Sequence, residues 1–534
     1  MNMSKKNLKM PQEETILSLP KLLLAIVSGL MLTLSFPPFD LSFMAWFALV
    51  PLFMCLENLA PRLAFRLGFI AGAAHYLSLV YWIVVVLGRY GNMNIVLSTI
   101  LCVLLCLYMA LYIAVFSFFI PFSRESRLSL LLTGSLWVGL EYIRAMFLTG
   151  FPWCLLGYTQ YRYLGVIQIA DIFGVYGLSL LIVLANGLIY CVISRLFNKA
   201  ARPVKGDILK YEAPIIVLMA IASLTYGHYR LSGQKQDTAG QSVRTVVIQG
   251  NIDQSLKWDP AFQAETIALY QKLTRSANDF RPDLIVWPET SVPFFFQDED
   301  TLSAKVASTA KESGAALIFG SPAYRQTENT INYYNRAYLI SSDNDTLKYY
   351  DKVHLVPFGE YVPLKRLLSF INRLVPAAGD FAQGDEIVTL RHDRMAIGVL
   401  ICFEAIFPEI ARAHAKNGAN ILVNITNDAW FGKTSAPYQH LAMSVFRAVE
   451  NRMPVIRSAN TGFSAYIGPD GSIISRGNLF TEEVLKASLN ISVQPLSFYA
   501  RFGDIFAQSL LAISLATCLL CLRQRRKAGG SFLS

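Results

Sequence analysis

The sequence predicts a protein of two parts: a polytopic α-helical membrane part and an α/β domain in which helices cover β-sheets. Composition is the first reason, because 54% of the 534 residues are hydrophobic and only 16% are charged, against about 25% charged in soluble proteins. The second reason is position, since apolar blocks fill the chain to about residue 227 and return at 505–522. The third is an alternation of strand and helix patterns between about 241 and 495.

The apolar blocks predict about eight membrane spans, because each is near the length that a bilayer requires. They lie at about 16–36, 42–57, 65–87, 94–120, 128–147, 165–194, 212–228 and 505–522. The first is interpreted as a retained span because Pro37 and Pro38 follow it, not the small residues of a signal-peptide cleavage site. The block at 165–194 exceeds one span, so we expect it to tilt or to begin in the interface.

The order of these blocks predicts three regions. Residues 1–230 form a membrane domain of about seven helices. Residues 231–500 form the α/β domain, and residues 501–534 form a last span and a basic tail.

Basic residues mark one side of the predicted membrane domain. They precede the first span, fill alternate loops and follow the last span: Lys5, Lys6, Lys9, Arg62, Arg66, Arg124, Arg127, Arg195, Lys199, Arg202, Lys205, Lys210, Arg523, Arg525, Arg526 and Lys527. The opposite short loops hold only Arg89 and Arg162. Because basic loops stay in the cytoplasm, both termini are predicted to be cytoplasmic and residues 231–500 to lie outside.

The same loops account for much of the net charge of +10, which therefore does not indicate a nucleic-acid partner. The soluble region has no zinc-finger spacing, RNP-like motif or basic helix. It also has no Walker motif, no GxGxxG after a strand and no histidine pair at ligand spacing, so no metal or other cofactor is expected.

The elements of the soluble region follow from hydrophobic periodicity and turn residues. Helices are predicted at 261–279, 301–313, 408–417 and 438–451, the first because Phe262, Ile267, Tyr270 and Leu273 share one face. Strands are predicted at 243–249, 283–287, 315–320, 335–341, 387–390, 394–402, 420–426, 454–459, 463–467 and 473–474. The last two flank Gly468 and Gly471, which indicate a hairpin turn.

Two features of the membrane part exceed simple anchoring. The outer segment 151–160, here called the aromatic loop, contains Phe151, Trp153 and Tyr158 among Gly and Pro residues. Charged residues in or near spans are costly and often functional, and the chain has Glu141, Arg144 and Asp171 there. The alternative for Glu141 and Arg144 is a simple pair, because residues three apart share a helix face.

Cys402 is the only cysteine of the soluble region, at the end of a buried strand and before a helix that begins near Pro408. The positive end of a helix dipole favours a thiolate, which would make Cys402 a nucleophile. The alternative is a small buried hydrophobic residue, as many cysteines are. Glu289 and Lys352 also follow predicted strands, and each alone would ordinarily be a solvated loop residue.

The order Glu289, Lys352, Cys402 within one α/β region resembles the nitrilase, or carbon–nitrogen hydrolase, superfamily, whose members use a Glu–Lys–Cys triad in an αββα sandwich. The whole chain resembles the apolipoprotein N-acyltransferase family. The most specific segments lie at 151–153, 157–158, 249–252, 257–258, 287–289, 352–363 and 427–431. The resemblance implies that Cys402 is the nucleophile, Glu289 the general base and Lys352 the electrostatic stabiliser, with Glu360 and Glu404 as supporting carboxylates.

These roles agree with the chemistry of an acyl transfer. A thiolate attacks an ester carbonyl, and the tetrahedral oxyanion needs a positive charge or aimed N–H groups. Lys352 supplies the charge and the amide after Cys402 a donor, while Glu289 takes the thiol proton and later activates an amine. Phe403 follows the nucleophile where relatives often carry an aromatic with a polar handle, and we assign Phe403 no polar role.

The sequence also suggests contact with lipid. Residues 292–296 are an aromatic run, and residues 364–375 mix apolar residues with Lys365, Arg366 and Arg373. Both suit a bilayer interface or a lid over a lipid pocket, here expected within 357–381, and core packing is the alternative. Trp258 and Trp430 are predicted to line the substrate-binding wall, again with core packing as the alternative.

The resemblance implies an enzyme of the bacterial inner membrane with its catalytic domain in the periplasm. A phospholipid, with phosphatidylethanolamine as the expected donor, would acylate Cys402, and the thioester would acylate the N-terminal amine of a diacylglyceryl-cysteine in an apolipoprotein. The protein is expected to act as a monomer. The alternatives are a membrane-tethered amidase or other nitrilase-like hydrolase, and a non-catalytic transporter or receptor, which the intact Glu289, Lys352 and Cys402 argue against.

Overall fold

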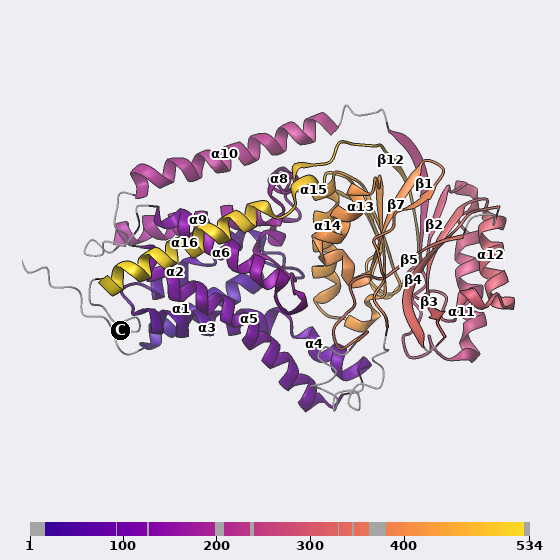
Figure 1. The fold of residues 1–534 in the computed structure, drawn as a ribbon, viewed down its shortest axis with the longest axis horizontal. Coiled ribbons are helices and arrows are strands. Elements are labelled where there is room, and N and C mark those ends of the chain that lie inside the picture. The colour runs from indigo at the N-terminus through magenta and orange to yellow at the C-terminus, as the bar shows by residue number, and fades with distance from the viewer. Residues whose placement is uncertain are drawn as a thin grey trace, which may run out of the picture.

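The computed structural model describes residues 17–527 except 92, 125, 127, 198–207, 235–239, 329, 344–346 and 362–380. A bundle of helices forms one half of the molecule, and two β-sheets with flanking helices form the other (Figure 1). The long helix α10 (Ile208–Gln234) runs along the bundle and leads to strand β1, and the chain returns after strand β12 to helix α16 (Ile505–Lys527).

The bundle contains helices of unequal length. Its main elements are α1 (Leu19–Leu34), η1 (Ser42–Trp46), α2 (Val50–Cys55), α3 (Pro61–Leu79), α4 (Trp82–Val85), η2 (Val86–Tyr90), α5 (Ile95–Ser123), α6 (Ser129–Met146), η3 (Phe147–Thr149), η4 (Leu156–Gln160), α7 (Leu164–Ile167), α8 (Ala170–Phe173) and α9 (Val175–Phe197). In the part of the chain that is described, 4 helices are long and apolar enough to cross a membrane, or up to 5 if the bent pair α3 and α4–η2 is one span.

Besides the bent pair α3 and α4–η2, two further predicted spans are broken helices. The block at 42–57 is the short pair η1 and α2. The block at 165–194 is α7, α8 and α9, and the break before α9 falls at Gly174, whose φ of +63° suits glycine. Hydropathy alone does not report such breaks, because the residues on both sides remain apolar.

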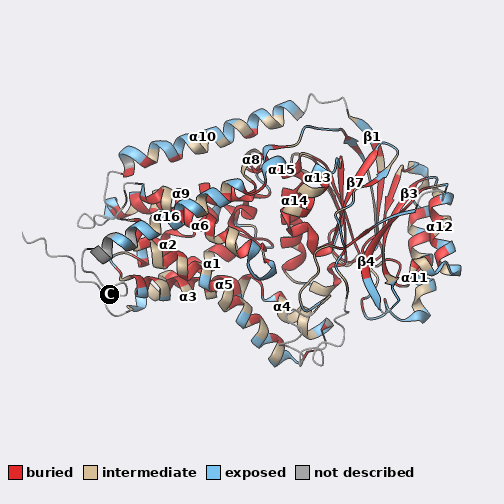
Figure 2. Cartoon of the chain, in the orientation of Figure 1, coloured by how far each residue is buried: buried red, intermediate tan, exposed pale blue. Residues whose placement is uncertain are grey.

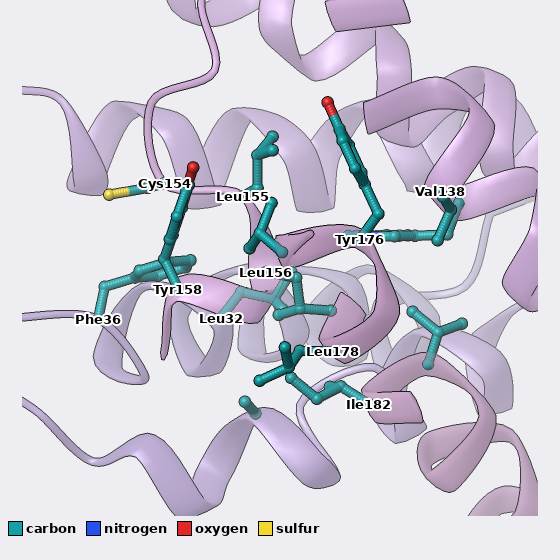
Figure 3. Close-up of a cluster of buried hydrophobic side chains, with 14 of the residues drawn as sticks. Leu32, Phe36, Val138, Cys154, Leu155, Leu156, Tyr158, Tyr176, Leu178 and Ile182 are labelled. Carbon is teal, nitrogen blue, oxygen red and sulfur yellow. The ribbon is translucent and has the colours of Figure 1, made fainter. Parts of the chain in front are cut away.

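Small residues let the helices of the bundle approach closely. A Cβ at Gly72 of α3 would lie 2.8 Å from Ala110 Cα of α5, and one at Gly29 of α1 would lie 2.2 Å from Ala71 O. Such contacts are typical of helix packing in membranes. Figure 3 shows the nearby core, where Leu155, Leu156 and Tyr158 of the aromatic loop lie among buried residues of α1, α6 and α9.

The soluble half is an α-β-β-α sandwich. One sheet has the order β12-β1-β2-β3-β4-β5 and the other β11-β10-β9-β8-β7-β6. Their strands are β1 (Gln241–Gln249), β2 (Leu284–Val286), β3 (Ala316–Gln326), β4 (Ile331–Ile340), β5 (Leu347–Asp351), β6 (Leu390–His392), β7 (Met395–Ile401), β8 (Ile421–Thr426), β9 (Val455–Ala459), β10 (Ala465–Ile467), β11 (Ile473–Arg476) and β12 (Glu483–Ile491).

Helices cover the outer faces of both sheets. Helices α11 (Pro260–Arg275) and α12 (Thr301–Ser313) cover the first, and their N-termini are capped by Asp259 and Asp300. Helices α13 (Pro408–Lys416) and α14 (Ala436–Asn451) cover the second and lie between it and the bundle. Figure 2 shows α14 buried along nearly its whole length, whereas α11 and α12 expose an outer face.

Most predicted elements of the sandwich form within a few residues of their expected ends. The strand expected at 387–390 begins only at Leu390, in β6. Strands β5 and β12 were not predicted, and both lie at an edge of the first sheet. Their burial patterns are mixed and partly exposed, so they lack the apolar alternation that marks a core strand.

Candidate active site

Cys402 lies where strand β7 ends and the short 3₁₀ turn η8 (Cys402–Ile406) begins. Its φ is +51°, a left-handed conformation that costs a non-glycine residue about 1–3 kcal/mol and is concentrated at functional sites. Its side chain is buried, with 8% of the residue exposed. Helix α13 begins at Pro408, as predicted, and the turn η8 separates Cys402 from the N-terminus of that helix.

A buried network brings Lys352, Glu360 and Glu289 together. Lys352 Nζ lies 2.9 Å from the Glu360 carboxylate and 3.8 Å from Glu289 Oε1. Asn335 of β4 joins the two acids, because its Nδ2 donates to Glu289 Oε1 at 2.8 Å and to Glu360 Oε1 at 2.9 Å. The backbone N–H of Val356 donates to Glu360 Oε2 at 2.8 Å. Asn335 was not predicted, since nothing in its local sequence distinguishes it.

Glu289 keeps one oxygen available. Its Oε2 is buried and has no hydrogen-bond partner among the residues that the structure describes. The backbone carbonyl of Glu289 accepts a hydrogen bond from Lys257 Nζ at 3.0 Å. Lys257 is itself buried, so a second lysine lies beside the general-base candidate. The sequence placed Lys257 in a family segment but assigned it no role.

Glu404 accepts hydrogen bonds from the backbone just before Cys402 and just after Lys352. Its Oε1 accepts from the backbone N–H of Val353 at 2.7 Å, from that of His354 at 3.1 Å and from the Tyr350 hydroxyl at 2.9 Å. Its Oε2 accepts from the Ile401 N–H at 2.7 Å. Glu404 is fully buried.

The electrostatics favour a protonated thiol and a charged lysine in the resting site. Burial, with Glu289 as the next cause, raises the pKa of the Cys402 thiol. Burial opposes the charge of Lys352, but Glu360 and Glu289 outweigh it, so the pKa of Lys352 is raised. Burial raises the pKa of Glu404 to about 7 and lowers that of Lys257 to about 8. Cys402 therefore needs a base to become a nucleophile, contrary to the expectation of a thiolate stabilised by a helix dipole.

The aromatic loop of the bundle contacts the residues around Cys402. Glu141 Oε1 accepts from the Leu156 N–H at 2.7 Å, and Arg144 Nη1 donates to Trp153 O at 3.1 Å. Glu141 and Arg144 of α6 thus bind the backbone of the aromatic loop. Their role is therefore not limited to the simple pairing with each other that was the alternative. The Phe151 ring stacks on that of Phe403, with centroids 6.5 Å apart.

The predicted substrate-wall residues occupy different surroundings. Trp258 is 49% exposed and lines a cavity of about 420 Å³ together with Phe294, Phe295 and Tyr333. Trp430 is partly buried in the turn η9 (Asp428–Phe431). The run at 292–296 is divided, because Val292 and Phe296 pack into the core. Most of the predicted lid, residues 362–380, lies outside the described residues.

Within the described ranges, no group of three His, Cys, Asp or Glu side chains is arranged to hold a metal ion. The contacts above bring together a thiol, two lysines and three carboxylates. A thiol beside a carboxylate and an ammonium group can form and resolve an acyl-thioester by nucleophilic catalysis.

Comparison with known proteins agrees with both halves of the fold. The family model described as "Apolipoprotein N-acyltransferase N-terminal domain" matches residues 28–188, and that of "Carbon-nitrogen hydrolase" matches residues 245–495. An apolipoprotein N-acyltransferase of Geobacter metallireducens is 44% identical, over 98% of this chain and 99% of its own length. One of Rickettsia prowazekii is 31% identical, over 94% of this chain and 98% of its own.

Among solved structures, a mutant of the Nesterenkonia AN1 amidase from the nitrilase superfamily is 20% identical. The match covers 50% of this chain and 96% of that chain, with a TM-score of 0.38.

The sandwich with its buried Glu, Lys and Cys, joined to a bundle of apolar helices, defines a membrane protein with a carbon–nitrogen hydrolase domain. The near full-length relatives go further. This chain belongs to the apolipoprotein N-acyltransferase family.

Proposed function

We propose that this enzyme transfers a fatty acyl chain from a membrane phospholipid to the N-terminal amine of the diacylglyceryl-cysteine of apolipoproteins, through a thioester on Cys402. Family membership supports the reaction. The observation that carries the mechanism is the buried cluster in which Lys352 Nζ lies 3.8 Å from Glu289 Oε1 and interacts electrostatically with Cys402.

The first half-reaction acylates the enzyme. Glu289 takes the thiol proton, and the Cys402 sulfur attacks the ester carbonyl of the phospholipid. The Lys352 ammonium group and the Phe403 N–H stabilise the tetrahedral oxyanion. The carbon–oxygen ester bond then breaks, and the leaving lysophospholipid oxygen takes the proton from Glu289.

The second half-reaction resolves the thioester. The acceptor amine gives a proton to Glu289 and attacks the thioester carbonyl, and the same donors stabilise the second oxyanion. The carbon–sulfur bond breaks, an amide forms, and Cys402 recovers its proton from Glu289. Glu360 and Asn335 hold Lys352 and Glu289 in place, and Glu404 fixes the backbone on which Cys402 lies.

The membrane arrangement is part of the proposal. We assign residues 1–230 to the membrane domain, 231–500 to the catalytic domain and 501–534 to the last span and tail, with about eight spans. Basic residues at the end of the bundle remote from the sandwich support a periplasmic catalytic domain, cytoplasmic termini and a bacterial inner membrane. There, Lys21 Nζ donates to Glu57 O at 3.4 Å and Arg124 Nη1 to Leu56 O at 3.3 Å.

The proposal also covers the acyl donor, the binding wall and the assembly state. Phosphatidylethanolamine is the proposed donor, and Trp258 and Trp430 are proposed to line the binding wall. One chain supplies Cys402, Glu289 and Lys352, which supports action as a monomer.

The test is intact mass spectrometry of the full-length protein after incubation with phosphatidylethanolamine, with Cys402→Ala as the control. We expect a hydroxylamine-labile acyl adduct on the wild type only. A diacylglyceryl-cysteine peptide added next should remove the adduct and gain an amide-linked acyl chain. Release of free fatty acid without peptide acylation would instead identify a hydrolase, and the lack of any adduct would contradict the thioester mechanism.

A further inference from the structure

We propose that His440 of α14 is a positioning residue for acyl transfer, which fixes the peptide group between Cys402 and Phe403 so that the Phe403 N–H is aimed at the oxyanion. The inference rests on the proposed function and names a residue outside the Glu–Lys–Cys triad.

The contact that carries the inference is between His440 and the nucleophile's own backbone. His440 Nε2 lies 3.2 Å from Cys402 O, and Asn424 Nδ2 lies 3.5 Å from the same oxygen. His440 and Asn424 are both fully buried. Because Cys402 adopts a φ of +51°, its peptide group needs support that ordinary strand pairing does not provide.

The surroundings of the ring determine which nitrogen carries the proton. Arg457 Nη2 lies 3.0 Å from His440 Nδ1, and a guanidinium group can only donate. The same Nδ1 lies 3.2 Å from Asp428 Oδ1, which can only accept. A proton on Nδ1 would satisfy this contact alone, whereas a proton on Nε2 satisfies the contacts with both Arg457 and Cys402 O. We therefore assign the proton to Nε2, where it is donated to Cys402 O. Burial and then Arg457 lower the pKa of His440, so the ring stays neutral. Arg457 also donates to Asp428 Oδ2 at 2.7 Å, which completes a fully buried cluster.

The consequence follows from peptide geometry. A trans peptide group is planar, and its C=O and N–H point in opposite directions. When His440 holds the Cys402 oxygen on one side, the Phe403 N–H is held on the other. That N–H is the backbone donor that the mechanism assigns to the oxyanion, so His440 acts on the reaction through the orientation of one peptide plane.

The membrane domain in turn fixes the position of His440. The neighbouring Gln439 accepts hydrogen bonds at its Oε1 from Trp153 Nε1 at 2.7 Å and from Trp82 Nε1 at 3.1 Å. The Trp153 ring centroid also lies 5.9 Å from that of His440. The aromatic loop therefore anchors the helix that orients the nucleophile segment, which links docking on the membrane domain to catalysis.

The experiment compares two reactions of Cys402 in full-length protein. Acylation by phosphatidylethanolamine forms an oxyanion, whereas alkylation by iodoacetamide is a direct displacement that forms none. For His440→Leu we expect acylation to fall about 100-fold, as for the loss of one oxyanion-hole donor, with the KM for lipid and the alkylation rate changed less than about threefold. His440→Gln places an amide donor near the position of Nε2 and should restore acylation to within about tenfold of wild type.

His414 provides a matched control. It is a fully buried histidine whose Nε2 lies 2.8 Å from the carbonyl of Val399, earlier on the same strand β7. His414→Leu should therefore change acylation less than about threefold. If His440→Leu does not fold, His440→Asn, whose amide is too short to reach Cys402 O, takes its place beside His440→Gln.

The inference is overturned if the His440 variants acylate like wild type, or if acylation and alkylation fall together. It is also overturned if Gln restores no more activity than Leu or Asn. If the wild type forms no adduct, both the proposed function and this inference fail. If the wild type forms the adduct and the His440 variants behave as described above, only this inference fails.

Discussion

At the scale of single residues, the site consists of buried charges that stabilise one another. Lys352 is 1% exposed and Glu289 5% exposed, and a buried charge is costly unless it is paired. Removing one member of a buried pair costs about 3–5 kcal/mol, because the other charge is left uncompensated. Informative substitutions here therefore keep the shape of a side chain and change one chemical property.

Glu289→Gln is such a substitution. Its amide oxygen can still accept the hydrogen bond from Asn335, but the group cannot take the thiol proton. We expect thioester formation to fall by roughly 10²–10⁴-fold, the range for loss of a general base. Thermal unfolding should change little, because the Glu360 carboxylate, 2.9 Å from Lys352 Nζ, still compensates the lysine charge. Glu265→Gln, on the exposed face of α11, is the control. Thioester formation within a few-fold of wild type in Glu289→Gln would assign the base elsewhere, and the mass-spectrometric adduct assay measures it.

Lys257 gives the reaction a predicted pH dependence. Burial lowers the pKa of Lys257 to about 8, so its charge is present below pH 8 and lost above it. The charge favours the Cys402 thiolate, because the electrostatic interaction between the two groups is reciprocal. The Lys257→Arg variant keeps its charge at every pH tested, because arginine stays charged. We therefore expect the ratio of the wild-type to the Lys257→Arg rate of thioester formation to be constant below about pH 7 and to fall above about pH 8. A constant ratio from pH 6 to 9.5 would show that this charge does not contribute to thioester formation.

At the scale of elements, the sequence predicts what local patterns encode. Strand β7 is continuously apolar and Pro408 begins a helix, so the position of Cys402 at a strand end was predicted correctly. The edge strands β5 and β12 have no such pattern. Asn335 and His440 were also missed, because their partners Glu289 and Cys402 lie 46 and 38 residues away in sequence. No spacing rule connects residues across a sandwich whose register only the folded sheets define.

Strand β3 gives a prediction at this scale. A Cβ at Gly320 would lie 2.5 Å from the Thr290 backbone nitrogen and 2.8 Å from Glu289 Cα, closer than real Cβ contacts allow. Gly320→Ala should therefore displace the segment that carries the base and reduce thioester formation by at least about tenfold, since a shift near 1 Å can cost about 10²-fold. The mass-spectrometric adduct assay measures the loss.

The control for this prediction is Gly233→Ala in α10, where a Cβ would meet nothing within 4 Å. It should keep the wild-type rate of thioester formation and the wild-type thermal stability. Equal activity of Gly320→Ala and wild type would show that β3 can shift to accommodate the added Cβ without moving Glu289.

At the scale of the whole molecule, the two halves share one hydrophobic core. The cluster that contains Leu32 and Trp137 of the bundle also contains Phe446 of α14 and Leu422 of β8. An ion pair adds to this contact, because Arg452 Nη2 at the end of α14 lies 2.8 Å from Asp171 Oδ2 of α8 in the bundle. The sandwich is thus docked against the membrane domain, and η8 lies on the docked side, because its residues Phe403, Ala405 and Ile406 belong to this shared cluster.

This docking makes the proposed orientation testable, because the sandwich and the basic end of the bundle must lie on opposite sides of the membrane. Lys311, exposed on α12, marks the sandwich, and Leu196, 68% exposed at the end of α9, marks the basic end. In spheroplasts, a membrane-impermeant maleimide should label Lys311→Cys at once but Leu196→Cys only after the membrane is opened. Wild-type protein is the control, since six of its seven described cysteines are buried. Labelling in the reverse order would place the catalytic domain in the cytoplasm. The basic loops would then lie outside the cytoplasm, contrary to the positive-inside rule.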